Sequence, residues 1–287
     1  MSGNYRLDVI DDESKDTMFT ARFYVFEPLV SLSSTISDNT DIDIRSSHQQ
    51  LSFSLKYPSS LGVTDARSQF SVAVMQNRRE DNMVWCPPAP IVRQGVAEWA
   101  HVRQLIFPAG NEYHKFEFLD PHRNSMGVDS LRWDGENYHV YLFHDYPRRA
   151  YVYDEDANGA FLVRNSDNVD IGYTTDYSIV HFALDVPKLQ GEVYIDGQWT
   201  NNSLSEKYKM QYDDEKSCYT ISLPLKYGYY NYQYLLVEEE THSNTRSLSK
   251  TGLTEGDFYQ TSNNYAILVY YHPNGGRTWQ LVGLEEK

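Results

Sequence analysis

The chain has 287 residues, a length typical of about two domains. Its 25 basic and 40 acidic residues give a net charge of −15, which disfavours nucleic acid and anionic membrane surfaces as partners. A composition of 40% hydrophobic and 23% charged residues is typical of globular proteins, and no apolar run approaches the roughly 20 residues of a membrane-spanning helix.

The first elements predicted along the chain form a β-hairpin. Apolar residues alternate with polar ones over 4–9 and again over 19–26, and an acidic turn at 11–16 separates the two segments. This pattern predicts two antiparallel strands. Because a lone hairpin is marginally stable in water, we expect it to join a larger sheet.

Short strands follow one another closely along the rest of the chain, with turn residues between them and no sustained helical periodicity. The predicted strands are 51–57, 70–75, 105–107, 113–118, 138–143, 151–153, 161–163, 179–184, 192–195, 219–223, 230–236 and 265–271. Such spacing is typical of β-sandwiches. The sequence therefore predicts an all-β protein of tandem β-sandwich domains, and we place a boundary near residue 178.

The sequence lacks the common catalytic motifs. There is no G-x-S-x-G, H-E-x-x-H, G-x-G-x-x-G or phosphate-binding loop. Cys86 and Cys218 are distant in the sequence and lie outside any C-x-x-C motif, so we expect two free, buried thiols. We predict no enzymatic activity, no cofactor and no catalytic residue; a glycosidase with paired carboxylates stays open as a minor alternative.

One loop matches part of a calcium-binding sequence. Asp154, Asp156 and Asn158 precede Gly159 in a D-x-D-x-N-G pattern, whose alternating oxygen ligands resemble the start of a calcium loop. The twelfth position is Asn165 instead of glutamate, and Asn-Gly between strands also favours a hairpin turn. We favour the turn and expect no bound metal.

The carboxy-terminal part of the chain, from residue 179 onward, contains a pattern of the early-set sandwiches related to glycogen-binding modules. A strand leads into Gly197-Gln198-Trp199, and a later strand reads Gly228-Tyr229-Tyr230-Asn231-Tyr232-Gln233-Tyr234. Exposed tryptophans bind sugar rings in those modules, but no second tryptophan lies in a comparable position. We favour a turn-packing role for Trp199, with sugar binding as the alternative.

These residues belong to a longer resemblance. Residues 225–234 read LKYGYYNYQY, residues 255–263 read EGDFYQTSN, and the closing strand is 265–271; further matches lie at 67–77 and 110–113. Together they resemble the plug protein family of the type IX secretion system of Bacteroidetes, formerly a domain of unknown function. The resemblance covers nearly the whole chain and is most specific near the carboxy terminus.

The resemblance implies a non-catalytic plug or accessory subunit. It would dock on the periplasmic side of the outer-membrane β-barrel translocon and close its pore, which makes that barrel the expected partner and the location periplasmic and outer-membrane associated. Members of the family have a signal peptide and an amino-terminal sandwich domain, which we expect to be absent from this sequence. The alternative is a glycan-binding module protein of a Bacteroidetes cell envelope.

The series of strands and the resemblance together set the expected domains. Residues 1–28 would be the terminal hairpin of an upstream β domain, 29–178 a middle β-sandwich, and 179–287 an Ig-like or early-set β-sandwich resembling a glycogen-binding module. Interface hot spots favour tryptophan, tyrosine and arginine. The candidate binding residues are therefore the loop residues Arg78, Arg79, Trp85 and Trp133, with Trp199 as the candidate for a glycan.

Overall fold

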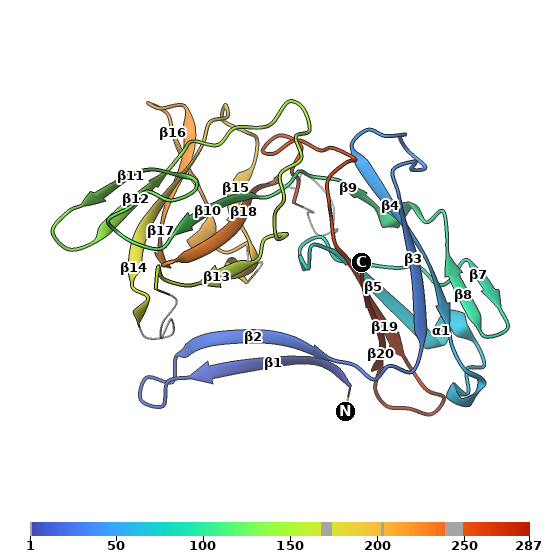
Figure 1. The fold of residues 1–287 in the computed structure, drawn as a ribbon. Helices are drawn as coiled ribbons and strands as arrows, with labels where there is room; N and C mark the ends of the chain where they lie inside the picture. Colours follow the sequence, from blue (N-terminus) through green and yellow to red (C-terminus); the bar gives the residue numbers. More distant parts are fainter. Residues whose placement is uncertain (1, 168–173, 202–203, 239–248) are drawn as a thin grey trace. The chain divides into compact units, whose positions relative to one another are not determined.

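The computed structural model confirms an all-β protein of β-sandwiches. It describes residues 2–167, 174–201, 204–238 and 249–287, in which the single α-helix, α1 (Ala66–Gln69), has four residues. The chain divides into two compact units. Unit 1 comprises Met1–Phe107 together with Asn263–Lys287, and unit 2 comprises Pro108–Ser262 (Figure 1).

Unit 1 contains a two-stranded hairpin and two larger sheets. The hairpin pairs β1 with β2, one sheet has the order β20-β19-β5-β6, and the other has the order β3-β4-β8-β7 with β9 beside β4. The strands are β1 (Gly3–Ile10), β2 (Thr17–Val25), β3 (Ser31–Ser37), β4 (His48–Lys56), β5 (Phe70–Gln76), β6 (Val84–Trp85), β7 (Ile91–Arg93), β8 (Val96–Trp99), β9 (Ile106–Pro108), β19 (Tyr265–Tyr271) and β20 (Gln280–Glu286).

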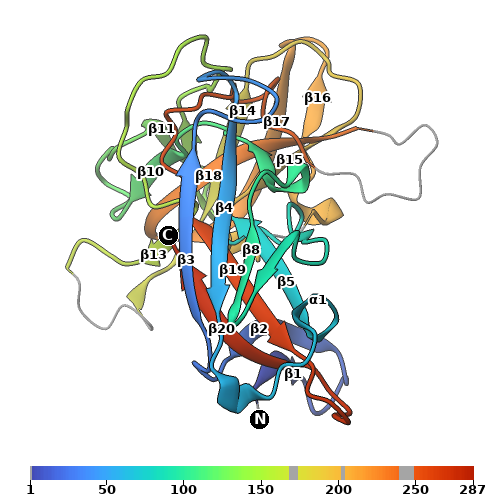
Figure 2. The ribbon, with the colours of Figure 1, turned by 90° about the vertical axis from the view of Figure 1, so that its right-hand side faces the viewer.

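The core of unit 1 lies between its two larger sheets. Leu51, Phe53 and Leu55 of β4 meet Val72 of β5 and Ile267 of β19 there, and all five are at most 4% exposed. Figure 2 shows β3, β4 and β8 in front of β19. The sandwich therefore closes only when the carboxy-terminal strands return to pair with β5.

Unit 2 is a sandwich of two sheets. One has the order β11-β12-β14-β17-β16, and the other is built around β18, which pairs with β10, β13 and β15. The strands are β10 (His114–Phe118), β11 (Val128–Trp133), β12 (Tyr138–Leu142), β13 (Phe161–Val163), β14 (Tyr177–Leu184), β15 (Glu192–Asp196), β16 (Gln211–Asp213), β17 (Cys218–Lys226) and β18 (Gly228–Val237).

Short 3-10 turns complete the structure: η1 (Ser59–Leu61) and η2 (Arg103–Leu105) in unit 1, and η3 (Gln198–Thr200) and η4 (Glu206–Tyr208) in unit 2.

The core of unit 2 is rich in aromatic rings. Phe116 of β10 lies between Phe182 of β14 and Tyr230 of β18, with ring centroids 5.7 and 5.2 Å away. The tyrosine-rich sequence of β18 thus fills the interior of the sandwich.

The units correct the predicted domain boundaries. A boundary at 178 would fall inside β14, which pairs with β12 on one side and β17 on the other. Residues 263–287 pair with β5 and so belong with the first part of the chain. Periodicity indicates strands but carries no information about pairing between segments that are distant in the sequence, which explains the difference.

Three local predictions also need comment. The predicted strands at 4–9 and 19–26 form a hairpin, as expected, but the hairpin is a two-stranded sheet of its own and does not join a larger sheet. The segment 151–153 is not a strand, and β13 pairs with β18 instead of with it. Both cysteines are free, as expected, but only Cys218 is fully buried, whereas Cys86 is partly exposed.

Candidate functional site

A buried charged network in unit 2 includes residues from the two segments, 225–234 and 255–263, that carry most of the resemblance. His114 of β10 contacts Asp145 through Nδ1 (3.0 Å) and Glu255 through Nε2 (2.8 Å). The hydroxyls of Tyr232 and Tyr234 donate to Asp145 Oδ2 at 2.9 and 2.7 Å. The backbone N–H of Tyr234 donates to Glu255 Oε1 at 2.7 Å. We call these five residues the His114 network.

The electrostatics of this network favour a charged imidazole. Burial opposes the charge, but the carboxylates of Glu255 and Asp145 outweigh burial and raise the pKa of His114 to about 10. The same contact lowers the pKa of Asp145 despite its burial. The Glu255 side chain is only 2% exposed, and its contacts with His114 and Tyr234 hold β10, β18 and the loop that carries Glu255 together.

Other residues that carry the resemblance also form internal cross-links. In unit 2 the Asn111 side chain donates to the backbone oxygen of Glu255 at 3.0 Å. In unit 1 the side chain of Asn77 donates to Asn263 Oδ1 at 2.7 Å and accepts from the backbone N–H of Asn264 at 2.8 Å. The pattern that carries the resemblance is therefore largely a set of structural hydrogen bonds.

The 154–159 loop uses its carboxylates within the protein. Asp154 forms an ion pair with Lys115 at 2.5 Å, and Asp156 accepts the backbone N–H groups of Tyr113 and Asn158. Asn158 and its neighbour Gly159 both have positive φ, at 48° and 83°, as a tight turn requires. Among the described residues there is no group of three or more His, Cys, Asp or Glu side chains that could hold a metal ion.

The predicted docking residues differ in their surroundings. Arg79 is buried and binds Asp81 through two nitrogens at 3.1 and 2.6 Å, so it is not available as a docking residue. Arg78 lies at the surface and binds Glu286 at 2.7 Å. Trp85 and Trp133 are 55% and 53% exposed.

Trp199 lies in η3 and packs in a turn. Its Nε1–H donates to the backbone oxygen of Asn231 at 2.9 Å, and its ring lies 6.2 Å from Phe182, 6.1 Å from Tyr208 and 5.9 Å from Tyr230, measured between centroids. These contacts agree with the favoured turn-packing role. A ring so enclosed has little face to offer a sugar.

An exposed apolar surface on the β1–β2 hairpin was missing from the sequence prediction. One face of the hairpin carries apolar side chains from both strands, each 39% exposed or more: Tyr5, Leu7, Val9, Phe19, Phe23 and Val25. Tyr5 and Phe23 stack with centroids 5.4 Å apart. On the other face Tyr24 packs against the outer side of the β5–β19–β20 sheet. The alternation was visible in the sequence, but the exposure of its apolar side was not.

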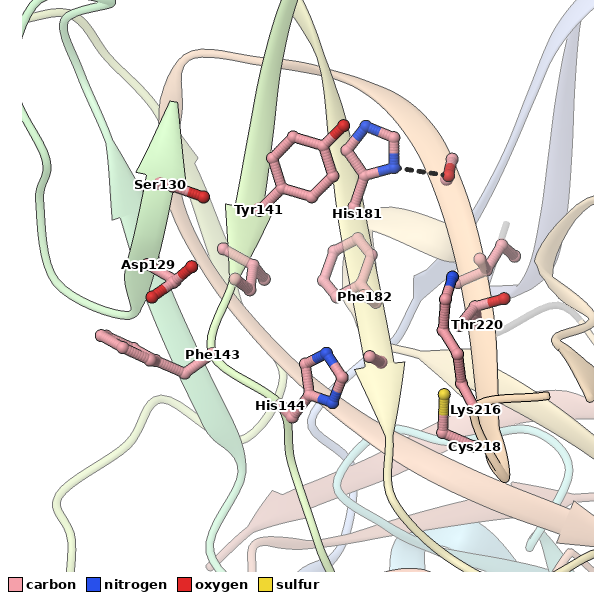
Figure 3. Close-up of a pocket in the computed structure, with 14 residues that line it drawn as sticks. Asp129, Ser130, Tyr141, Phe143, His144, His181, Phe182, Lys216, Cys218 and Thr220 are labelled. Atoms are coloured by element: carbon pink, nitrogen blue, oxygen red, sulfur yellow. Dashed lines mark hydrogen bonds between the residues drawn. The ribbon is translucent and has the colours of Figure 1, made fainter. Parts of the chain in front are cut away.

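A pocket of about 510 Å³ opens on the outer face of the five-stranded sheet of unit 2. Figure 3 shows Asp129 and Phe143 on one side of it and Lys216 and Thr220 on the other, with Tyr141 toward one end. Phe143 is 59% exposed. Sequence reasoning missed this pocket because it assembles from four segments whose polar residues are unremarkable one at a time.

A hydrogen-bonded relay borders the pocket. Asp134 Oδ2 lies 2.8 Å from His139 Nε2, His139 Nδ1 lies 2.8 Å from His181 Nε2, and His181 Nδ1 lies 2.7 Å from Ser222 Oγ. Burial and the neighbouring His139 lower the pKa of His181. The His181 ring stacks on Tyr141 with centroids 4.3 Å apart and planes 8° from parallel. The relay thus fixes the wall of the pocket that His181 and Tyr141 form.

Comparison with known proteins identifies a structural relative. A crystal structure of a hypothetical protein from Parabacteroides merdae ATCC 43184 matches with a TM-score of 0.93 and 40% sequence identity, over all of this chain and 72% of that one. The chain belongs to the same family as this protein. The searches of family models and of curated proteins found no match. No helix among the described residues is long and apolar enough to cross a membrane.

Proposed function

We propose that the protein is a non-catalytic plug or accessory subunit that docks on the periplasmic side of the outer-membrane type IX translocon and closes its pore. The observation that carries the proposal is that the polar residues behind the resemblance form hydrogen bonds inside the protein. Its buried polar residues brace each unit from within, Asn77 in unit 1 and Glu255 in unit 2, and this supports a rigid body for each unit. A braced body without a reaction centre in the pattern suits a pore-closing role.

Two exposed tryptophans, Trp85 and Trp133, are the proposed contacts with the translocon. Trp85 lies at the edge of its sheet and Trp133 at the end of β11, each more than half exposed. Large exposed aromatic side chains contribute strongly to protein interfaces. Arg78 could add a charged contact, although it would first have to leave Glu286.

We further propose that the β1–β2 hairpin belongs to an upstream β domain. Its apolar face would be covered by the other strands of that domain, since contiguous exposed apolar surface marks a contact site. The structural relative leaves room for such a domain, because the match covers only 72% of its chain.

The test is co-purification of the tagged full-length protein from its native bacterium after mild detergent treatment of the outer membrane. We expect a large β-barrel protein at near-stoichiometric yield. Trp85→Ala and Trp133→Ala should lower that yield, whereas Ile44→Ala, at another exposed apolar residue, should leave it unchanged. Recovery of the wild-type protein without any barrel would refute the proposal.

A further inference from the structure

The pocket of unit 2 presents polar groups that the protein does not use. Among the described residues, the carboxylate of Asp129 and the hydroxyls of Ser130, Tyr141 and Thr220 line the pocket and have no side-chain hydrogen bond or ion pair within the protein. This carboxylate and these three hydroxyls lie around one cavity and are available to hydrogen-bond a ligand.

The aromatic side chains of the pocket add a second kind of contact. Phe143 projects from the end of β12 with 59% of its surface exposed, and the Tyr141 ring is held against His181. Aromatic side chains bury large apolar areas and can lie against the C–H face of a ring. The pocket therefore combines flat apolar surface with hydroxyl and carboxylate groups.

From this combination we infer that the pocket binds a neutral saccharide. A carboxylate and three hydroxyls can pair with the alternating hydroxyls of a sugar, while Phe143 covers its apolar face. The volume of about 510 Å³ falls within the roughly 300–1,000 Å³ typical of small-ligand sites. The inference does not depend on docking to the translocon, and it does not use Trp199.

The charges of the pocket disfavour other ligand classes. Among the described residues that line it, Lys216 is the one lysine or arginine, and it already lies 3.2 Å from Asp213. A phosphate would therefore meet one shared cation and the carboxylate of Asp129. A cationic ligand would find the carboxylate of Asp129 but would also lie beside the ammonium group of Lys216, so the two opposite charges give it no net advantage. A purely apolar ligand would strip water from the carboxylate and hydroxyls without replacing their hydrogen bonds, which is unfavourable for each group.

The relay makes the wall rigid before a ligand arrives. Because both nitrogens of His139 and of His181 are engaged, neither ring can turn without breaking a hydrogen bond. Tyr141 lies against the second of these rings. A surface that is already ordered loses less conformational entropy on binding.

The experiment is saturation-transfer NMR on the full 287-residue chain with neutral trisaccharides: maltotriose, cellotriose, mannotriose and chitotriose. We expect at least one to bind. Phe143→Ala and Asp129→Asn should each weaken its binding about tenfold, and Trp133→Ala, which removes an exposed aromatic ring outside the pocket, should not. Thermal melts check that each variant is folded.

Two results would overturn the inference. One is the absence of binding for all four sugars at millimolar concentration, and the other is binding that both pocket substitutions leave unchanged. In the first case, binding of a sugar phosphate would assign the pocket to an anionic ligand instead. Because the pocket variants keep Trp85 and Trp133, co-purification with a barrel should be unaffected, so the saccharide site and the docking proposal can fail separately.

Discussion

Replacing His114 by glutamine should destabilise unit 2 strongly. The substitution removes the cation between the carboxylates of Asp145 and Glu255, which are held 3.0 and 2.8 Å from the imidazole. Removing one partner of a buried ion pair typically costs about 3–5 kcal/mol, because a buried charge is left without compensation. Asp145 would lose its cation, whereas Glu255 would keep Arg148 at 3.5 Å, so we expect a loss toward the lower end of that range.

The pH dependence of unfolding gives a second value for the contribution of His114 to stability. The folded-state pKa of His114, about 10, lies above the value of 6.5 for a free histidine. Its contribution to stability is therefore complete below about pH 6.5 and is lost as pH rises toward 10. At about 1.4 kcal/mol for each pH unit, raising the pH from 6.5 to 9 should remove roughly 3 kcal/mol.

Urea unfolding at several pH values tests both magnitudes. Wild-type stability should fall between about pH 6.5 and pH 9, and His114→Gln should lack that component of the fall. His144→Gln is the matched control: its exposed pair with Asp185 should contribute less than about 1 kcal/mol. Equal pH profiles for wild type and His114→Gln would refute the argument that His114 is charged in the folded protein.

Three further outcomes are expected. Gly228→Ala should lower stability by about 2 kcal/mol or more in urea melts, because its Cβ would lie 2.4 Å from the backbone oxygen of Leu162; stability equal to wild type would contradict this. Cys86 should resist iodoacetamide near pH 8 until the protein unfolds, since burial raises the pKa of its thiol to about 12. Calcium should leave the melting temperature unchanged after chelation, because Asp154 and Asp156 already have partners; a rise with calcium concentration would reveal a site.

Strong local patterns predicted individual strands well. The alternating tyrosines of β18 and the apolar run of β19 mark two central strands of their sheets, and both lie where the sequence indicates. β3 reads SLSSTIS and β20 reads QLVGLEE. The serines of one and the glycine and glutamates of the other weaken the apolar alternation, so neither strand was predicted.

Local sequence patterns predicted neither the pairing of strands that are distant in the sequence nor the burial of a charged side chain. Nothing in the residues of β19 specifies β5 as its partner, so the discontinuous unit 1 could not be derived from periodicity. Arg79 was expected at the surface because arginine usually lies there. It is buried because Asp81, two residues later, binds two nitrogens of its guanidinium group, and this short R-x-D spacing was the available signal.

The location of the residues that carry the resemblance limits what the resemblance says about function. Its polar residues, including Asn77, Glu255 and Tyr234, are buried and hydrogen-bonded within the units. Such residues determine whether a chain folds in this way, whereas binding depends on side chains that reach solvent. Trp85 and Phe143 reach solvent, and neither lies in the pattern. Two proteins that share the pattern can therefore share the fold and still differ in what they bind, which is why substitutions at these exposed positions test function most directly.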